Sequence, residues 1–255
     1  MKRIVIKVGT SVLTEQNRLA KVRMMALVTL ISELQAKYEV ILVTSGAVAA
    51  GYGVLKLDKK IVANRQALAS IGQPILAMTY KKKFERLGVN SAQVLLVDDD
   101  FNSHHHIKHA QDMIEVLIKK GVVPIVNEND AISKAELTFG DNDWLSAKVA
   151  LHFDAKMLVI LSDIAGYYDK DPRYHEDALL KRVVTSIKKD ELEVKSEPGS
   201  TFATGGITTK LIAANFLLGN GLSTFLSSGM DLKDVRSFLL DNEHKGGTLF
   251  KAENE

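Results

Sequence analysis

Short runs of apolar residues alternate along this chain with longer segments in which apolar residues recur every three or four positions. The short runs are rich in Val and Ile, which is typical of strands buried on both faces of a sheet. The periodic segments, for example 20–37 and 107–120, predict amphipathic helices. We therefore expect an α/β fold with a central, mainly parallel β-sheet sandwiched between helices. The predicted strands are 4–6, 40–43, 91–97, 122–126, 159–161, 223–226 and 247–250.

Several of these strands stop abruptly at polar residues or glycine. The residues that follow are Lys7, Gly9 and Thr10 after 4–6, Thr44, Ser45 and Gly46 after 40–43, Asn127 to Asp130 after 122–126, and Ser162 and Asp163 after 159–161. In an open parallel sheet, ligands bind beyond the carboxyl ends of the strands. The sequence therefore predicts one site built from these strand ends.

Two of the strand ends are suited to an anion. Lys7-Val8-Gly9-Thr10-Ser11 combines an ammonium group with a glycine that allows close approach to the backbone, although its spacing is not that of a P-loop. Thr44-Ser45-Gly46 precedes a helix predicted to begin at Ala47, whose N-terminal amides would attract negative charge. Each segment alone could be a solvated strand end or an ordinary N-cap, but together they favour a phosphate ligand.

Amides and carboxylates gather in two further segments, 127–130 and 139–143. Such groups can bind both ends of a zwitterion, because a carboxylate accepts from an ammonium group and an amide can donate or accept. The alternative is an Asx-rich turn followed by the N-cap of a helix over 144–151. The segment between them, 131–137, is predicted to be a hairpin or a lid.

A second glycine-rich turn, 203–210, precedes a helix and carries Lys210 in its first turn. A cation near a helix N-terminus is mildly unfavourable unless an anion lies between them, which favours a second phosphate contact over a solvent-facing lysine. The charged segment 188–200 ends in Glu-Pro-Gly-Ser and is predicted to be a surface loop.

The composition excludes several classes of protein. A net charge of +2 over 255 residues gives no indication of a nucleic-acid or anionic-membrane partner. No apolar run approaches the roughly 18 to 20 residues of a spanning helix, and Met1-Lys2-Arg3 leads directly into a strand instead of a signal peptide. We therefore expect a cytoplasmic protein. The absence of cysteine excludes disulfides and thiolate chemistry.

A histidine cluster at 104–109 raises the question of a metal site, since His105 and His109 are four residues apart on a predicted helix. The apolar positions 107, 110, 114 and 117 mark the buried face of that helix and leave the pair on the solvated side. We therefore expect no functional metal site there.

Taken together, these motifs resemble those of the glutamate 5-kinases, within the amino acid kinase superfamily. The resemblance covers essentially the whole chain and is carried by Ile6 to Ser11, Val43 to Ala47, Val123 to Asp130, Phe139 to Asp143, Asp171 to Arg173 and Thr204 to Lys210. It implies a single amino acid kinase-type domain over 1–255, with an acceptor-binding lobe at 1–155 and a nucleotide-binding lobe at 156–255. It also implies a form without the appended RNA-modification-type β domain of many bacterial members.

The resemblance assigns roles to particular residues. Lys7 and Lys210 would contact the transferring phosphoryl group, and Asp163 would orient the two lysines. The residues implied for the acceptor are Ser45, Gly46, Asn127, Asp130, Asn142 and Asp143. The residues implied for the nucleotide are Lys7, Gly9, Thr10, Ser162, Asp163, Thr204, Gly205, Gly206, Ile207, Thr208, Thr209 and Lys210.

The implied reaction uses ATP and Mg²⁺ to phosphorylate L-glutamate to L-glutamyl 5-phosphate, the first step of proline biosynthesis. Proline is implied as a feedback inhibitor, and a homo-oligomer, dimer or tetramer, is expected. Two alternatives stay open: a related kinase acting on another carboxylate or on a phosphate, and a non-catalytic sensor of a nucleotide or an amino acid.

Overall fold

The computed structural model describes residues 1–133, 142–193 and 206–252. Its strands are β1 (Lys2–Val8), β2 (Thr14–Glu15), β3 (Arg18–Leu19), β4 (Tyr38–Val43), β5 (Ser91–Leu96), β6 (Val123–Glu128), β7 (Met157–Ser162), β8 (Val183–Val184), β9 (Ser223–Ser228) and β10 (Thr248–Phe250). Its helices are α1 (Thr10–Leu13), α2 (Lys21–Leu34), α3 (Ala47–Tyr52), α4 (Val62–Glu85), η1 (Asp98–Asn102), α5 (His104–Lys119), α6 (Asp143–His152), α7 (Lys189–Leu192), α8 (Ile207–Gly219), α9 (Lys233–Arg236) and η3 (Ser237–Asp241).

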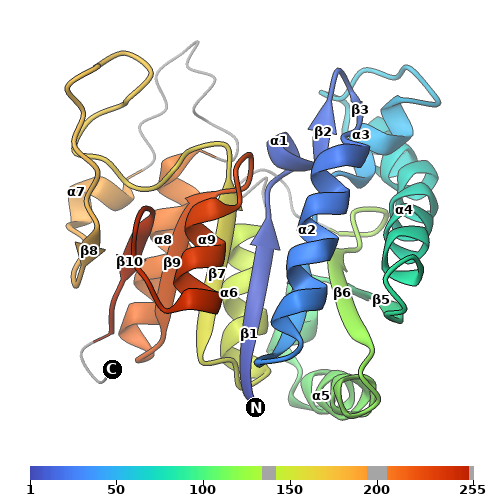
Figure 1. Cartoon of the computed structure of the whole chain (residues 1–255). Coiled ribbons are helices and arrows are strands. Elements are labelled where there is room, and N and C mark those ends of the chain that lie inside the picture. The colour runs from blue at the N-terminus through green and yellow to red at the C-terminus, as the bar shows by residue number, and fades with distance from the viewer. Residues whose placement is uncertain (134–141, 194–205, 253–255) are drawn as a thin grey trace.

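The predicted α/β fold is confirmed. Eight strands of the described part form one sheet in the order β5-β6-β4-β1-β7-β9-β10-β8, and its pairs are parallel except for β10 with β9 (Figure 1). The remaining strands, β2 and β3, form a small antiparallel hairpin that the apolar pattern did not reveal. No helix in the described ranges is both long and apolar enough to cross a membrane.

Helices cover both faces of the sheet, and strand β1 shows why. Ile4 and Ile6 belong to a buried cluster that includes residues of α2, α4 and α9, whereas Val5 belongs to the opposite cluster, with residues of α5, α6 and α8. Successive side chains of a strand point to opposite faces, so a continuous apolar run fills both layers. Strand β1 lies in the middle of the sheet, with β4 on one side and β7 on the other.

The loop predicted over 188–200 was only partly correct. Lys189–Leu192 forms the short helix α7, and the rest of that segment from 194 lies outside the described residues. Glu191 of α7 accepts a hydrogen bond from the Tyr167 hydroxyl and pairs with Lys181 at 3.2 Å. These contacts attach α7 to the segment that follows β7. Of the hairpin or lid predicted at 131–137, residues 134–137 also lie outside the described part.

Helices α3 and α4 pack through glycines. A Cβ atom added to Gly72 would lie 1.8 Å from the carbonyl oxygen of Ala47, and one added to Gly51 would lie 1.9 Å from that of Leu68. Both distances are far below van der Waals contact, and the atoms that would be struck belong to the backbone. The two helices therefore approach each other as closely as peptide groups allow.

Gly72→Ala is expected to lower the free energy of unfolding by about 3 kcal/mol or more, because the new methyl group can be accommodated only by separating two helix backbones. Urea unfolding followed by circular dichroism measures the change. Gly219→Ala, at the end of α8 with open space around the added atom, is the control and should be neutral or stabilising by up to about 1 kcal/mol. Equal effects of the two substitutions would contradict the packing argument.

Candidate active site

The strand ends singled out from the sequence lie next to one another in the sheet. Strands β6, β4, β1 and β7 are consecutive neighbours, and Lys7 is in register with Val43 on one side and Ile160 on the other. Just past the strands, the Gly9 amide donates to the Leu161 carbonyl at 3.0 Å and the Thr44 amide donates to the Val126 carbonyl at 2.9 Å. The predicted convergence of these segments at one edge of the sheet is confirmed.

A buried ion triad lies at this edge. Lys7 Nζ lies 2.7 Å from one carboxylate oxygen of Asp143, and Lys210 Nζ lies 3.1 Å from the other. The Thr209 hydroxyl donates to Asp143 at 2.8 Å. The three charged residues come from β1 and from the first turns of α6 and α8, and each is at most 2% exposed. Two ammonium groups held by one carboxylate can both reach a single anionic group.

The lysines keep Asp143 ionised. Burial alone would raise the pKa of the Asp143 carboxyl, but the charges of Lys7 and Lys210 and the hydrogen bonds from Lys7 and Thr209 outweigh it and lower the pKa to about 2. The carboxylate is therefore charged throughout the neutral range. Its negative charge can hold both lysines in place.

The carboxylate that pairs with both lysines in the structure is Asp143, whereas the resemblance gave the orienting role to Asp163. Asp163 is exposed, accepts a hydrogen bond from the Ser162 hydroxyl at 3.0 Å, and contacts neither lysine. Asp143, which the resemblance placed near the acceptor, lies between them instead. The reason is topological: Asp143 begins a helix that packs against β1, whereas Asp163 follows β7 and faces solvent.

A chain of amide side chains adjoins the triad. Asn142 Nδ2 donates to the Thr44 carbonyl and, at 2.7 Å, to Asn127 Oδ1. Asn127 Nδ2 donates in turn to Gln73 Oε1 of α4 at 2.7 Å. The structure thus brings together Asn127 and Asn142, as expected, and adds Gln73. Sequence reasoning missed Gln73 because nothing distinguishes one polar residue on a long helix.

Ser45 and Gly46 connect β4 to α3. Gly46 has a φ of 100°, a left-handed conformation that favours glycine, and Ser45 is 6% exposed. Among the described residues, the Ser45 hydroxyl has no hydrogen-bond partner. A buried, unpartnered hydroxyl at a strand end is suited to contact a ligand.

Asp130 lies beyond β6 with a perturbed carboxyl group. Burial and the neighbouring charge of Glu128, opposed by Arg65, raise the pKa of Asp130 to about 6. A carboxyl whose pKa is raised by desolvation is a candidate for a ligand-binding role.

The residues expected at the nucleotide lie around the starts of two helices. Gly9 precedes α1, which begins at Thr10, and Gly206 precedes α8, which begins with Ile207, Thr208 and Thr209. Ser162 is buried at the end of β7. Thr204 and Gly205, like residues 139–141 of the acidic motif, lie outside the described residues.

The histidine pair lies on the solvated face of α5, as predicted. His105 and His109 are both exposed, and their Nε2 atoms are 3.0 Å apart. Within the described residues, no group of three or more His, Cys, Asp or Glu side chains could hold a metal ion.

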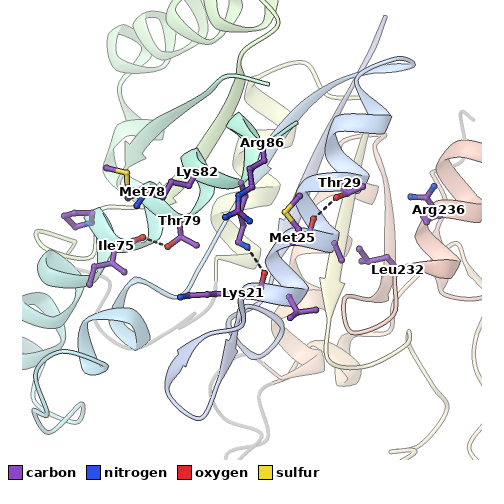
Figure 2. Close-up of a pocket in the computed structure, with 14 residues that line it drawn as sticks. Lys21, Met25, Thr29, Ile75, Met78, Thr79, Lys82, Arg86, Leu232 and Arg236 are labelled. Atoms are coloured by element: carbon purple, nitrogen blue, oxygen red, sulfur yellow. Dashed lines mark hydrogen bonds between the residues drawn. The ribbon is translucent and has the colours of Figure 1, made fainter. Parts of the chain in front are cut away.

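A separate groove of about 1150 Å³ lies between α2 and α4 and extends to α9 (Figure 2). Apolar residues such as Met25 and Met78 line it together with several cations, and Lys83 is buried there with its Nζ 2.7 Å from the Lys21 carbonyl. None of the lining residues belongs to the predicted site. The groove is thus distinct from the triad and the amide chain.

Known proteins match this chain over nearly its whole length. The amino acid kinase family model matches residues 2–227. Glutamate 5-kinase of Leishmania donovani is 52% identical, covering 98% of this chain and 95% of that protein, and glutamate 5-kinase of Wolinella succinogenes is 52% identical, covering 98% of each. Glutamate 5-kinase 2 of Bacillus subtilis is 41% identical, and the match covers 99% of this chain but 69% of that longer protein.

Solved structures agree on the fold. A crystal structure of an isopentenyl phosphate kinase substrate complex aligns with a TM-score of 0.67 at 16% identity, covering 98% of this chain and all of that one. Carbamate kinase of Giardia lamblia aligns with a TM-score of 0.66 at 14% identity, covering 99% of each chain. The fold, the strand-end site and the matching sequences agree that this chain belongs to the amino acid kinase family and, within it, to the glutamate 5-kinases.

Proposed function

We propose that this protein is an ATP-dependent kinase that phosphorylates the γ-carboxylate of L-glutamate to L-glutamyl 5-phosphate, the first step of proline biosynthesis. The observation that carries the proposal is the buried triad Lys7–Asp143–Lys210, placed at the strand ends of a glutamate 5-kinase fold. The triad adjoins the amide chain through Asn142, the residue before Asp143, and adjoins the start of α8, where Lys210 Nζ contacts the Gly206 carbonyl. This position suits the point at which phosphate passes from a nucleotide to an acceptor.

In this assignment, residues 1–155 form the acceptor lobe and residues 156–255 the nucleotide lobe. Ser45, Asp130 and Asn142 bind glutamate, with Gly46 and Asn127 close by. The nucleotide lies against Gly9, Thr10, Ser162, Asp163 and the residues from Thr204 to Lys210. The support is the position of the described residues: the first set lies at the ends of β4 and β6 and at the start of α6, and the second lies at the start of α1, at the end of β7 and at the start of α8.

The chemistry requires alignment and charge neutralisation. A γ-carboxylate has an ordinary pKa of about 4.3 and is already ionised at neutral pH, so no general base is needed. One carboxylate oxygen forms a bond to the γ-phosphorus, the bond from that phosphorus to the β-phosphate oxygen breaks, and ADP leaves with the electron pair. The obstacle is repulsion between anions. Lys7 and Lys210 offset the negative charge on the transferring group, and Asp143 positions both of them.

Mg²⁺ would accompany ATP. The described residues offer no cluster of carboxylates able to enclose the ion, which fits the usual preference of Mg²⁺ for phosphate oxygens and water. When bound, it supplies further positive charge at the phosphates.

The remaining expectations concern location and assembly. We infer that the enzyme acts in the cytoplasm, has no nucleic-acid partner, and forms a homodimer or homotetramer. Light scattering coupled to gel filtration tests the oligomeric state.

The proposed reaction is tested by assaying ADP release with L-glutamate, acetylglutamate, aspartate and carbamate as acceptors, with hydroxylamine present to trap an acyl phosphate. Glutamate should give both ADP and a hydroxamate. Nucleotide binding without turnover of any acceptor would favour a sensor, and a hydroxamate formed only from another acceptor would favour a related kinase.

Lys7→Ala and Lys210→Ala should each lower kcat by about 10²- to 10³-fold while changing the KM values much less, because the two charges matter most as negative charge is redistributed during transfer. Steady-state kinetics at saturating ATP measures the effect. Lys108→Ala, which removes an exposed lysine paired with Asp112, is the control and should have unchanged kinetics. Full activity of either site variant would exclude that lysine from the chemistry.

The kcat/KM for glutamate should fall as the pH drops through about 6, because Asp130 binds the α-ammonium group only when ionised and its pKa is raised to about 6. Asp130→Asn should raise KM and remove this inflection. We do not expect unfolding to cause this fall in kcat/KM. Because the pKa of Asp130 is raised, the folded state binds this proton more tightly than the unfolded state, so Asp130 makes folding more favourable as the pH falls. An inflection that persists in Asp130→Asn would belong to another residue.

Free L-proline should inhibit by competing with glutamate. Proline carries the α-carboxylate and the α-nitrogen that Asp130 and Asn142 would recognise, but it lacks the γ-carboxylate that accepts the phosphate. Titrating proline at several fixed glutamate concentrations, with ATP saturating, measures the effect. Inhibition that high glutamate does not relieve would show that proline acts elsewhere, and the absence of inhibition at millimolar proline would show that the pocket does not sense it.

A further inference from the structure

We infer that the groove between α2, α4 and α9 is a second ligand site, which binds an aliphatic carboxylate of the fatty-acid class with its headgroup at Lys83. We call this surface the α2–α4 groove. None of its described lining residues belongs to the triad or to the amide chain. Its occupant is therefore independent of the acceptor that the kinase site phosphorylates.

Exposed apolar side chains gather in this groove. Val22 is 84% exposed, Met78 50% and Ile75 37%, and Met25 and Leu232 line the same groove (Figure 2). Apolar side chains that are exposed together, with polar residues around them, mark a surface that binds a partner or a ligand. The groove volume of about 1150 Å³ exceeds the roughly 300 to 1,000 Å³ typical of small-molecule pockets, so a long chain fits in it.

The charged side chains of the groove all have one sign. No Asp or Glu is among the described residues that line it, and the cations among them are Lys21, Lys82, Lys83, Arg86 and Arg236. Arg236 pairs with Glu33 of α2, whereas the other four make no ion pair with any described residue. A concave surface lined by cations alone raises the local concentration of anions.

Lys83 is the point at which the anionic group would bind. Its side chain is only 8% exposed, and its Nζ donates to the Lys21 carbonyl at 2.7 Å, its one hydrogen-bond partner among the described residues. An ammonium group has three donors, so two remain for a ligand. Burial and the charges of Arg86 and Lys21 lower the pKa of Lys83. A bound carboxylate would supply the negative charge that this buried ammonium group lacks.

The lining also distinguishes between classes of anion. Among the described residues that form it, none is Phe, Tyr or Trp, so a nucleobase would find no ring on which to stack. Met25 and Met78 have flexible, unbranched side chains that adapt to the shape of an aliphatic chain. Because Lys83 is almost fully buried, a thin terminal group reaches its Nζ more readily than a folded surface does. A carboxylate at the end of an aliphatic chain meets each of these conditions.

Isothermal titration calorimetry with octanoate, decanoate and dodecanoate, each below its critical micelle concentration, tests the site. One molecule should bind per chain, and Kd should fall about 2- to 4-fold for each added methylene, as expected when a methylene group is buried. Decyltrimethylammonium, which has a chain of similar length and the opposite charge, should bind at least about 10-fold more weakly than decanoate.

Two variants locate the binding. Lys83→Met keeps the side-chain stem and removes the charge, and it should raise Kd for decanoate about 10-fold or more, the effect of one lost hydrogen bond to a charged group. Met78→Glu places a carboxylate at a half-exposed position of the groove and should raise Kd at least as much. Lys81→Met is the matched control, since Lys81 lies on the same helix, pairs with Glu85 and does not line the groove. It should leave Kd unchanged.

Several outcomes would overturn the inference. They are the absence of binding at millimolar decanoate, equal affinity for decyltrimethylammonium, and an affinity for decanoate that is the same in Lys83→Met and Met78→Glu as in the wild type. Light scattering of Met78→Glu tests a second copy of this chain as the occupant. Conversion of a wild-type oligomer into a monomer by this substitution would assign the groove to contact between subunits and would equally overturn the inference.

Discussion

A carboxylate buried completely between two lysines is the constraint on which the rest of this site depends. Asp143 can remain charged without contact with water only because Lys7 and Lys210 lie within 2.7 and 3.1 Å of its two oxygens. The three residues come from a central strand and two helices, so the ion pairs also tie those elements together. Removal of any one charge would leave the others buried and incompletely compensated, which links the stability of this region to its chemistry.

Parallel topology delivers these residues to one place. The strands β6, β4, β1 and β7 end on the same side of the sheet, and helices α1, α3, α6 and α8 begin there, so side chains and helix N-termini meet at a common surface. The three charged residues of the triad come from β1 and from the first turns of α6 and α8. The amide chain extends the site to Gln73 of α4, a helix that also contributes residues to the hydrophobic core.

The sequence was sufficient for the sheet, for its helical layers and for the strand-end location, because apolar periodicity and abrupt polar ends are local signals. The sequence was insufficient to predict which side chains contact one another in the site. Asp143 and Asp163 both follow suitable motifs, and only the packing of α6 against β1 shows that Asp143 joins the lysines. Gln73 gave no signal, since its contact is with a residue distant in the sequence, and Thr209 was expected at the nucleotide without its hydrogen bond to Asp143. The α2–α4 groove depends on side chains from separate helices and could not be read from either alone.

The glycine contacts between α3 and α4 have a consequence for how this enzyme can change over evolution. Where helices meet through side chains, their separation can be adjusted one methyl group at a time. Here the separation of the two helices is set by backbone atoms at Gly51 and Gly72, where there is no side chain to be exchanged for a slightly smaller or larger one. The distance from the strand end at Ser45 to the α4 residues Gln73 and Tyr80 is therefore close to invariant. A descendant enzyme that uses a longer or shorter acceptor substrate would have to change the side chains that line the pocket. The spacing of the α3 and α4 backbones behind those side chains would stay the same.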